Sequence, residues 1–458
     1  MSDFSRRSFL KLSTSAVGAS VLGMPIFART REYLQNSNNA KIYTVFFNIA
    51  PSIDDTHLRP MTNEEIIRRL KKDCDGVDFV IRDTTKDARL QSVLNEMRDL
   101  KKLDYDGVII YGWPRDYDVL RSGLPAINIS IVGDFMNMPY PIYHENKVLD
   151  AALDPWNFSS SAEVTSAMFE DLVAKIKLIK ALKLMKGASI LSVTDSQYVN
   201  VMYGDVLKYP PPGYNEIILD AINQAFGVKV KKIGTNEVVQ DEEIRNLWYN
   251  DSKEANEIAK TWMRDAEKMI NTLESEVVRS AKCYLAMKKL MKKYDTTAIA
   301  FHIRTLIKNP GPEDRVWPAL GTSQFQKEGI IAKCQSHLNI VLTDMLAQYS
   351  FGRPSMFGDF SVDTFNNTSI VQHCEGPWNP WGDDRRVPYI ITDHRERIVR
   401  ARSKPGVGAA SCIIYPPNET VTIWQVDVLR KEILVHTGTT IPMLTEDSKY
   451  KDHFWEMI

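Results

Sequence analysis

Carboxylate, amide and imidazole side chains recur at intervals of about two dozen residues in the segment 328–376. They are Asp359, Gln335 and His373, and each lies beside a glycine, a cysteine or an aromatic residue. Oxygen and nitrogen donors of this kind suit a divalent cation held at the ends of several secondary-structure elements. The pattern predicts a metal site with these three residues as ligands, although the amide of Gln335 cannot ionise.

The elements that must position these residues alternate in type along the chain. Strands are predicted over 41–48, 77–82, 107–113, 126–132, 188–193, 228–233 and 297–302, and helices over 63–72, 87–102, 161–186, 214–226 and 253–294. Such alternation is typical of βαβ units. The expected fold is α/β, with two doubly wound parallel-sheet domains over 31–157 and 158–376. Short strands over 389–392, 408–415, 420–428 and 433–437 predict a small β domain over 377–458.

The N-terminal segment is predicted to be a targeting signal. Residues 5–11 read Ser-Arg-Arg-Ser-Phe-Leu-Lys, a twin-arginine pattern, and an apolar run follows as far as Phe27. We expect residues 1–30 to be a cleaved signal peptide that directs the protein to the periplasm or cell envelope. The alternative is a short amphipathic helix that contains two arginines. No later run reaches the roughly 20 apolar residues of a membrane span, so none is expected in the mature chain.

The composition excludes some classes of protein. Lys and Arg total 57 and Asp and Glu total 58, without the basic excess of a nucleic-acid-binding protein. The five cysteines show no CxxC spacing, which argues against a zinc module or a disulfide framework. Cys334 and Cys374 are interpreted as small apolar residues behind the metal site, which export could oxidise if they are adjacent.

Several motifs resemble those of the L-fucose isomerase family and, more loosely, arabinose isomerase. They are Glu328-Gly329-Ile330, Cys334, Phe357-Gly358-Asp359 and His373-Cys374. The family pattern is Cys-Glu-x-Asp, then an Asp after an aromatic residue, then His-Cys. Its Glu, Asp and His hold a manganese-type cation, and its two carboxylates shuttle protons. The resemblance implies a monosaccharide substrate, Mn²⁺ and a homo-oligomer, either a trimer or a hexamer.

The resemblance assigns roles to individual positions. Asp359 and His373 keep the family's residue types, whereas Gln335 stands where the family has Glu, and His337 stands where it often has Asp. A neutral ligand raises the net charge of the site by one unit and weakens its hold on a cation. Asp359 then remains as the catalytic base, and His337 can assist because imidazole titrates near neutrality.

Substrate contacts are predicted in the C-terminal third of the chain. The loop around Trp378 and Trp381 joins aromatic rings to charged residues, a composition that suits stacking on a pyranose. A packed interdomain loop is the alternative. The resemblance also places His394 or His436 near the sugar.

Three functions therefore stay open. The first is a divergent aldose-ketose isomerase acting on a deoxy-aldose or related monosaccharide. The second is an exported glycoside hydrolase that uses carboxylates such as Asp359, Asp363 or Glu375. The third is a non-catalytic carbohydrate-binding protein on the same fold.

Overall fold

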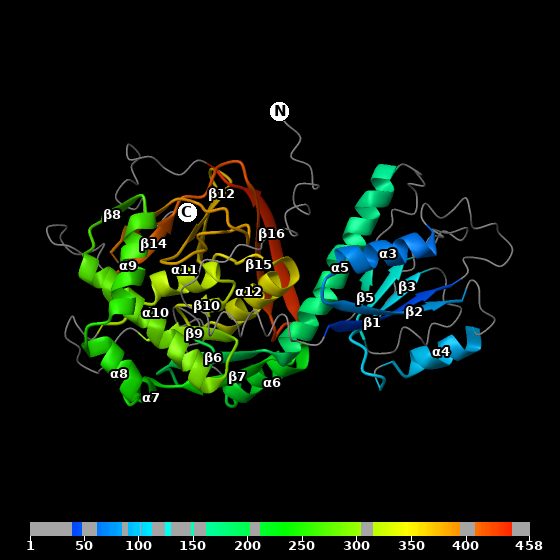
Figure 1. Cartoon of the computed structure of the whole chain (residues 1–458), viewed down its shortest axis with the longest axis horizontal. Helices are drawn as coiled ribbons and strands as arrows, with labels where there is room; N and C mark the ends of the chain where they lie inside the picture. The colour runs from blue at the N-terminus through cyan, green and yellow to red at the C-terminus, as the bar shows by residue number, and fades with distance from the viewer. Residues whose placement is uncertain are drawn as a thin grey trace. The chain divides into compact units, whose positions relative to one another are not determined.

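The computed structural model describes residues 39–47, 62–84, 90–100, 102–111, 124–129, 148–150, 162–201, 211–303, 315–393 and 408–441 (Figure 1). These residues form two compact units, the first ending at Leu184 and the second beginning at Met185. The predicted signal peptide lies outside the described residues. Among the described helices, none has the length and apolar character needed to cross a membrane.

The first unit contains a five-stranded parallel sheet. In order across the sheet, its strands are β2 (Val77–Asp83), β1 (Ala40–Phe46), β3 (Gly107–Tyr111), β4 (Ala126–Ile129) and β5 (Val148–Asp150). Helices α3 (Asn63–Asp73) and α5 (Ala162–Gly187) lie on one face, and α4 (Leu90–Arg98) lies on the other (Figure 1).

The alternation of side chains along β1 explains these layers. Ile42 and Phe46 pack under α3 and α5, while Tyr43 and Val45 point to the opposite face and pack under α4. A parallel strand covered on both faces must be apolar at nearly every position, and five of the seven β1 residues are apolar and buried.

The second unit contains a four-stranded parallel sheet. Across the sheet the order is β10 (Ile331–Lys333), β9 (Ala298–His302), β6 (Ser189–Thr194) and β7 (Lys229–Ile233). Its helices are α6 (Tyr214–Phe226), α7 (Thr235–Val239), α8 (Glu242–Tyr249), α9 (Lys253–Asp265), α10 (Glu274–Tyr294), α11 (Ala319–Lys327) and α12 (Leu338–Phe351). Polar side chains begin two of them: Asp241 caps α8 and Ser252 caps α9.

Three small sheets complete the second unit. One is a hairpin of β11 (Asp359–Asp363) and β12 (Thr368–Gln372), and another is a hairpin of β15 (Thr420–Asp427) and β16 (Glu432–Thr439). The third joins β14 (Ala410–Ile413) and β13 (Tyr389–Thr392) to β8 (Lys268–Ile270), which runs parallel to β13. The model therefore confirms a mixed α/β fold with parallel sheets and small antiparallel sheets near the C-terminus.

The C-terminal strands share a hydrophobic core with the preceding helices. Tyr389 and Ile413 belong to the same buried cluster as Trp262 of α9 and Tyr284 of α10. The domain boundary predicted between residues 376 and 377 therefore falls inside one continuous core. The three-domain division of the sequence stays a prediction.

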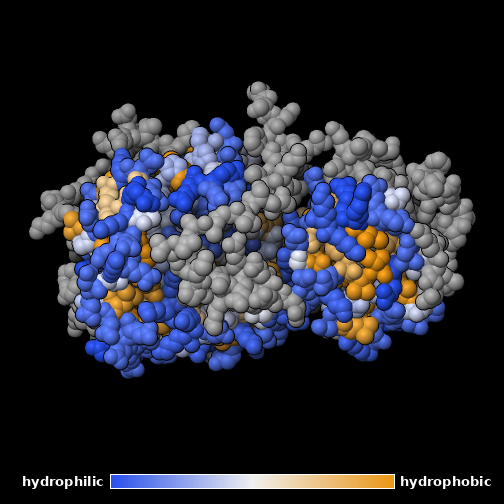
Figure 2. Space-filling model, viewed as in Figure 1, coloured by the Kyte–Doolittle hydropathy of each residue, from blue (hydrophilic) through white to orange (hydrophobic). Residues whose placement is uncertain are grey.

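Hydrophilic residues cover most of the described surface in the view of Figure 2, and apolar residues form separate patches. In the second unit, the two long hairpins carry a large part of the exposed apolar side chains. These are Phe360, Val362 and Phe365 on the β11–β12 hairpin, and Ile433, Leu434 and Val435 on β16.

Candidate metal centre

Three chain segments bring the site residues together. Cys334 follows the carboxyl end of β10, Asp359 begins β11, and His373 and Cys374 follow β12. The antiparallel register places Asp359 opposite Gln372, so the base of the hairpin carries both ends of the predicted motif. Cys334, Asp359 and His373 are separated by 25 and 14 residues in the sequence, and their segments meet next to the end of a parallel strand, where α/β proteins commonly place their sites.

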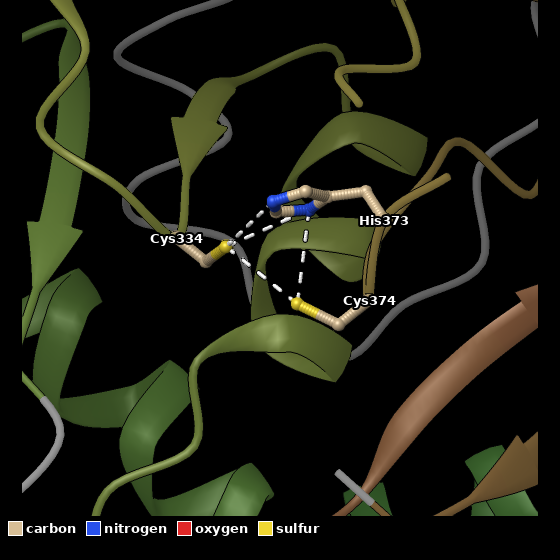
Figure 3. Close-up of side chains that lie close together, drawn as sticks. All are labelled: Cys334, His373 and Cys374. Carbon is tan, nitrogen blue, oxygen red and sulfur yellow. Dashed lines mark hydrogen bonds between the residues drawn. The ribbon is translucent and has the colours of Figure 1, made fainter. Parts of the chain in front are cut away.

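Two thiols and an imidazole form a compact group at this point (Figure 3). The Sγ atoms of Cys334 and Cys374 are 3.7 Å apart. Nδ1 of His373 lies 3.8 Å from Sγ of Cys334 and 3.7 Å from Sγ of Cys374. His373 is buried, whereas both cysteines are partly exposed. These three side chains could hold a metal ion, since each offers one ligand atom and all of the atoms lie within 4.8 Å of one another.

The buried carboxylate of Glu375 is hydrogen-bonded to the backbone of one of the two cysteines. Oε2 of Glu375 accepts a hydrogen bond of 3.0 Å from the backbone N–H of Cys334 and another from the hydroxyl of Thr322 in α11. Glu375 has no exposed surface, and among the described residues its Oε1 finds no hydrogen-bond partner. Burial raises the pKa of Glu375, although the positive charges of His373 and Lys333 act in the opposite direction.

The environment of His373 combines burial with negative charge. Burial lowers the pKa of its imidazole, but the charges of Cys374, Glu375 and Asp359 outweigh that effect and raise the pKa overall. The ring also packs against Phe357, with ring centroids 4.2 Å apart. His373 is therefore held in place by an aromatic neighbour and surrounded by groups that carry or can acquire negative charge.

The predicted ligands are only partly grouped by the structure. His373 belongs to the compact group, and Gln335 is a buried neighbour of Cys334. Asp359 is partly exposed and lies outside the group, although it is near enough for its charge to act on His373. The sequence was interpreted as giving the two cysteines a packing role, but their sulfurs lie 3.8 and 3.7 Å from Nδ1 of His373.

The predicted catalytic residue His337 occupies the N-cap position of α12, but its side chain makes no capping hydrogen bond. It is 8% exposed, and burial lowers the pKa of its imidazole to about 4. Its Nδ1 has no hydrogen-bond partner among the described residues. A pKa of about 4 leaves this imidazole uncharged at neutral pH, so the titration near neutrality that was expected of His337 does not hold in the folded protein.

The predicted substrate-binding residues have different environments. Trp378 is 2% exposed and its ring stacks on Tyr389 at 4.5 Å, inside the core. It therefore cannot stack on a pyranose, and the packed-loop interpretation holds for this residue. Trp381 is partly exposed, and the Arg385 guanidinium lies 4.7 Å from the centroid of its ring. His394 lies outside the described residues.

Comparisons with known proteins identify no family. A scan of family models finds no match, and neither does a search of curated proteins. Solved structures that resemble the chain include an ABC transporter solute-binding protein from Burkholderia multivorans, with 9% sequence identity and a TM-score of 0.16. The match covers 68% of this chain and 93% of that one. At this TM-score the likeness carries no argument about function.

Proposed function

We propose that this protein is a carbohydrate-active protein of the sugar isomerase type, which converts a deoxy-aldose or related monosaccharide to its ketose. One observation carries the proposal. The three segments on which the family resemblance rests, at residues 334–337, 357–359 and 373–374, are far apart in the sequence and converge at one point of the second unit. Export by the twin-arginine route and assembly into a trimer or hexamer belong to the same proposal and rest on the sequence alone.

Isomerisation moves a proton between adjacent carbons, so the site needs a base. Asp359 offers a partly exposed carboxylate at the edge of the group, and His337 offers an uncharged imidazole. Gln335 contributes no proton-transfer group, because an amide does not titrate. We therefore assign the proton transfer to Asp359, with turnover slower than a site with two carboxylates would give.

Manganese is the cation that the resemblance implies, but the grouped donors do not fit it. Manganese prefers carboxylate, carbonyl and water oxygens, whereas thiols select softer ions. The proposal therefore concerns the sugar chemistry, and no step of it is assigned to manganese.

The described geometry does not favour the hydrolase alternative. Asp359 and Asp363 are four residues apart on one strand, a separation of roughly 13 Å at about 3.3 Å per residue. Glycosidases hold their two carboxyl groups about 5–9.5 Å apart. Asp363 also accepts hydrogen bonds from the backbone of its own turn, and Glu375 is fully buried.

The proposal is tested by incubating the full-length protein with 6-deoxy-aldoses and aldopentoses in D₂O and following the products by NMR. We expect ketose formation with deuterium entering at C1, the carbon that gains a proton as C2 loses its own and becomes the carbonyl. Gln335→Glu should increase the rate by restoring a carboxylate. Asp359→Asn should lower it by about 100-fold or more, as loss of a general base does.

The matched control is Asp363→Asn, which removes an exposed carboxylate from the same strand and leaves an oxygen to accept the turn hydrogen bonds. It should keep the wild-type rate. Absence of both ketose and exchange in the wild type and in Gln335→Glu would refute the proposal. Sugar binding without turnover would then favour the binding-protein alternative, and cleavage of aryl glycosides would favour the hydrolase.

A further inference from the structure

The spacing of the donor atoms in the Cys334–His373–Cys374 group matches one coordination geometry. A zinc ion has bonds of about 2.3 Å to sulfur and about 2.0–2.1 Å to imidazole nitrogen, so tetrahedral angles separate two sulfurs by about 3.8 Å and sulfur from nitrogen by about 3.6 Å. The observed separations are 3.7 Å between the sulfurs and 3.7 and 3.8 Å from the sulfurs to Nδ1. Sγ of Cys334 also lies 4.0 Å from Nε2 of His373, so the imidazole must rotate for the lone pair of Nδ1 to point at an ion placed between the three atoms.

The charge of the group also suits a zinc-class ion. Two thiolates and a neutral imidazole compensate the two positive charges of the ion completely. The predicted set of Gln335, Asp359 and His373 would leave a net charge of one unit beside a buried histidine, which is costly away from water. Binding releases the two thiol protons, so the thiols need not be ionised beforehand.

Neighbouring groups fix the positions of the ligands. Glu375 holds the backbone of Cys334, and Phe357 holds the ring of His373. Such outer contacts orient metal ligands and are part of a working site. Three protein ligands leave the fourth tetrahedral position for water or substrate, which is the arrangement of catalytic rather than structural zinc sites.

We propose that Cys334, Cys374 and Nδ1 of His373 bind one zinc-class divalent ion, in place of a manganese ion held by oxygen ligands. The inference deepens the proposed function, on which it rests for the role of the ion towards a sugar. The binding itself is independent of turnover and is tested without any sugar.

The test uses the full chain, freed of metal and kept reduced with a phosphine, and titrated with Zn²⁺, Co²⁺ or Mn²⁺ alone. We expect one equivalent of Zn²⁺ to bind more tightly than Mn²⁺, and Co²⁺ to give thiolate-to-metal charge-transfer absorption. Cys334→Ser and Cys374→Ser should abolish that absorption and weaken zinc binding by more than about 100-fold, because a lost ligand costs more than a lost outer-shell partner.

Cys74→Ser is the matched control, since Cys74 is a buried cysteine in the first unit. It should bind zinc like the wild type. If the site variants fail to fold, protection of the wild-type thiols provides the test: zinc should slow alkylation of Cys334 and Cys374 in mapped peptides.

Three results would overturn the inference: no zinc binding, cobalt binding without thiolate absorption, or binding lost in Asp359→Asn but kept in both cysteine variants. These results are distinct from failure of the proposed function. If the protein isomerises sugars but does not bind zinc, the proposed function stands and the zinc site is refuted. If it binds zinc but converts no sugar, the zinc site stands and the proposed function is refuted.

Discussion

The carboxylate of Glu375 accepts a hydrogen bond of 3.0 Å from the backbone N–H of Cys334, 41 residues earlier in the chain. The same carboxylate accepts the hydroxyl of Thr322. One buried side chain therefore connects the end of β10, the segment after β12 and helix α11.

Removing this connection should loosen the metal centre. We expect Glu375→Ala to weaken zinc binding by roughly 10–100-fold, the range for groups that orient metal ligands. Glu375→Gln keeps an oxygen acceptor for Cys334 and should lose much less. Zinc titration of the two variants, beside their circular dichroism spectra, measures the difference. Equal affinities in both would mean that Glu375 does not position Cys334.

The two thiols of the centre should be open to oxidation when no metal is bound. Their sulfurs are 3.7 Å apart and need to approach to about 2.0 Å to form a disulfide. In the metal-free protein we expect a small disulfide reagent to link Cys334 and Cys374, with loss of two protons and two electrons to the reagent. Zinc should block the reaction. Peptide mass spectrometry detects the link, and its formation at the same rate with saturating zinc would contradict a shared site.

His337 should make the protein sensitive to acid. Because burial lowers its pKa from 6.5 to about 4, the unfolded chain binds a proton in this interval that the folded chain does not. The free energy of unfolding should therefore fall as the pH decreases from 6.5 to 4, by about 3 kcal/mol in all. The free energy of unfolding, measured by urea denaturation at several pH values in this range, should fall less steeply with decreasing pH in His337→Gln than in the wild type. The exposed His436 provides the control, and His436→Gln should keep the pH dependence of the wild-type free energy of unfolding.

A buried ion pair includes Lys333, the residue immediately before Cys334. Nζ of Lys333 is 2.9 Å from Oδ2 of Asp344, and the two side chains are 1% and 2% exposed. Lys333→Met leaves the carboxylate buried without its partner and should destabilise the protein by about 3–5 kcal/mol. The double variant Lys333→Met/Asp344→Leu should cost less than Lys333→Met alone. Denaturant midpoints of the wild type and the two variants measure these losses, and a double variant no more stable than Lys333→Met would contradict the coupling of the pair.

Gly352 and Gly382 approach each other in the fold, and substitutions at the two positions test the packing between their segments. Both have a positive φ, +75° at Gly382 and +66° at Gly352. A Cβ at Gly382 would overlap the carbonyl oxygen of Gly352, whereas a Cβ at Gly352 meets nothing within 4 Å. We expect Gly352→Ala to cost about 1–2 kcal/mol from backbone strain alone and Gly382→Ala to cost more than about 3 kcal/mol. Thermal unfolding compares them, and similar losses would contradict this account.

Strands β1 and β6 of the two parallel sheets were predictable because most of their residues are apolar and nearly all are buried. The run 41–48 appears as β1 and the run 188–193 as β6, each within two residues of the predicted bounds. The helix predicted over 253–294 is wrong in its middle, where the chain forms α9, β8 and α10. Asn271 has a φ of 54°, and β8 pairs with β13, whose residues lie 122 positions later in the chain. Helical periodicity contains no information about such a distant partner.

The predicted ligands Asp359 and His373 stay a prediction as a site, but their approach follows from the hairpin, since residues at the ends of paired strands meet. The pairing of Cys334 with Cys374 could not be read from their spacing, because it depends on how β10 and the β11–β12 hairpin approach one another. The position of each thiol beside a predicted ligand was the available signal.

The β11–β12 hairpin also has a mechanical consequence. Its five residue pairs fix the positions of Asp359 and residue 372 relative to each other, while Cys334 directly follows β10 of the four-stranded parallel sheet. The donor atoms thus sit on two separate supports, and Phe365 at the hairpin tip is 93% exposed. Any movement of the hairpin relative to the parallel sheet would therefore change the distance between Cys334 and His373.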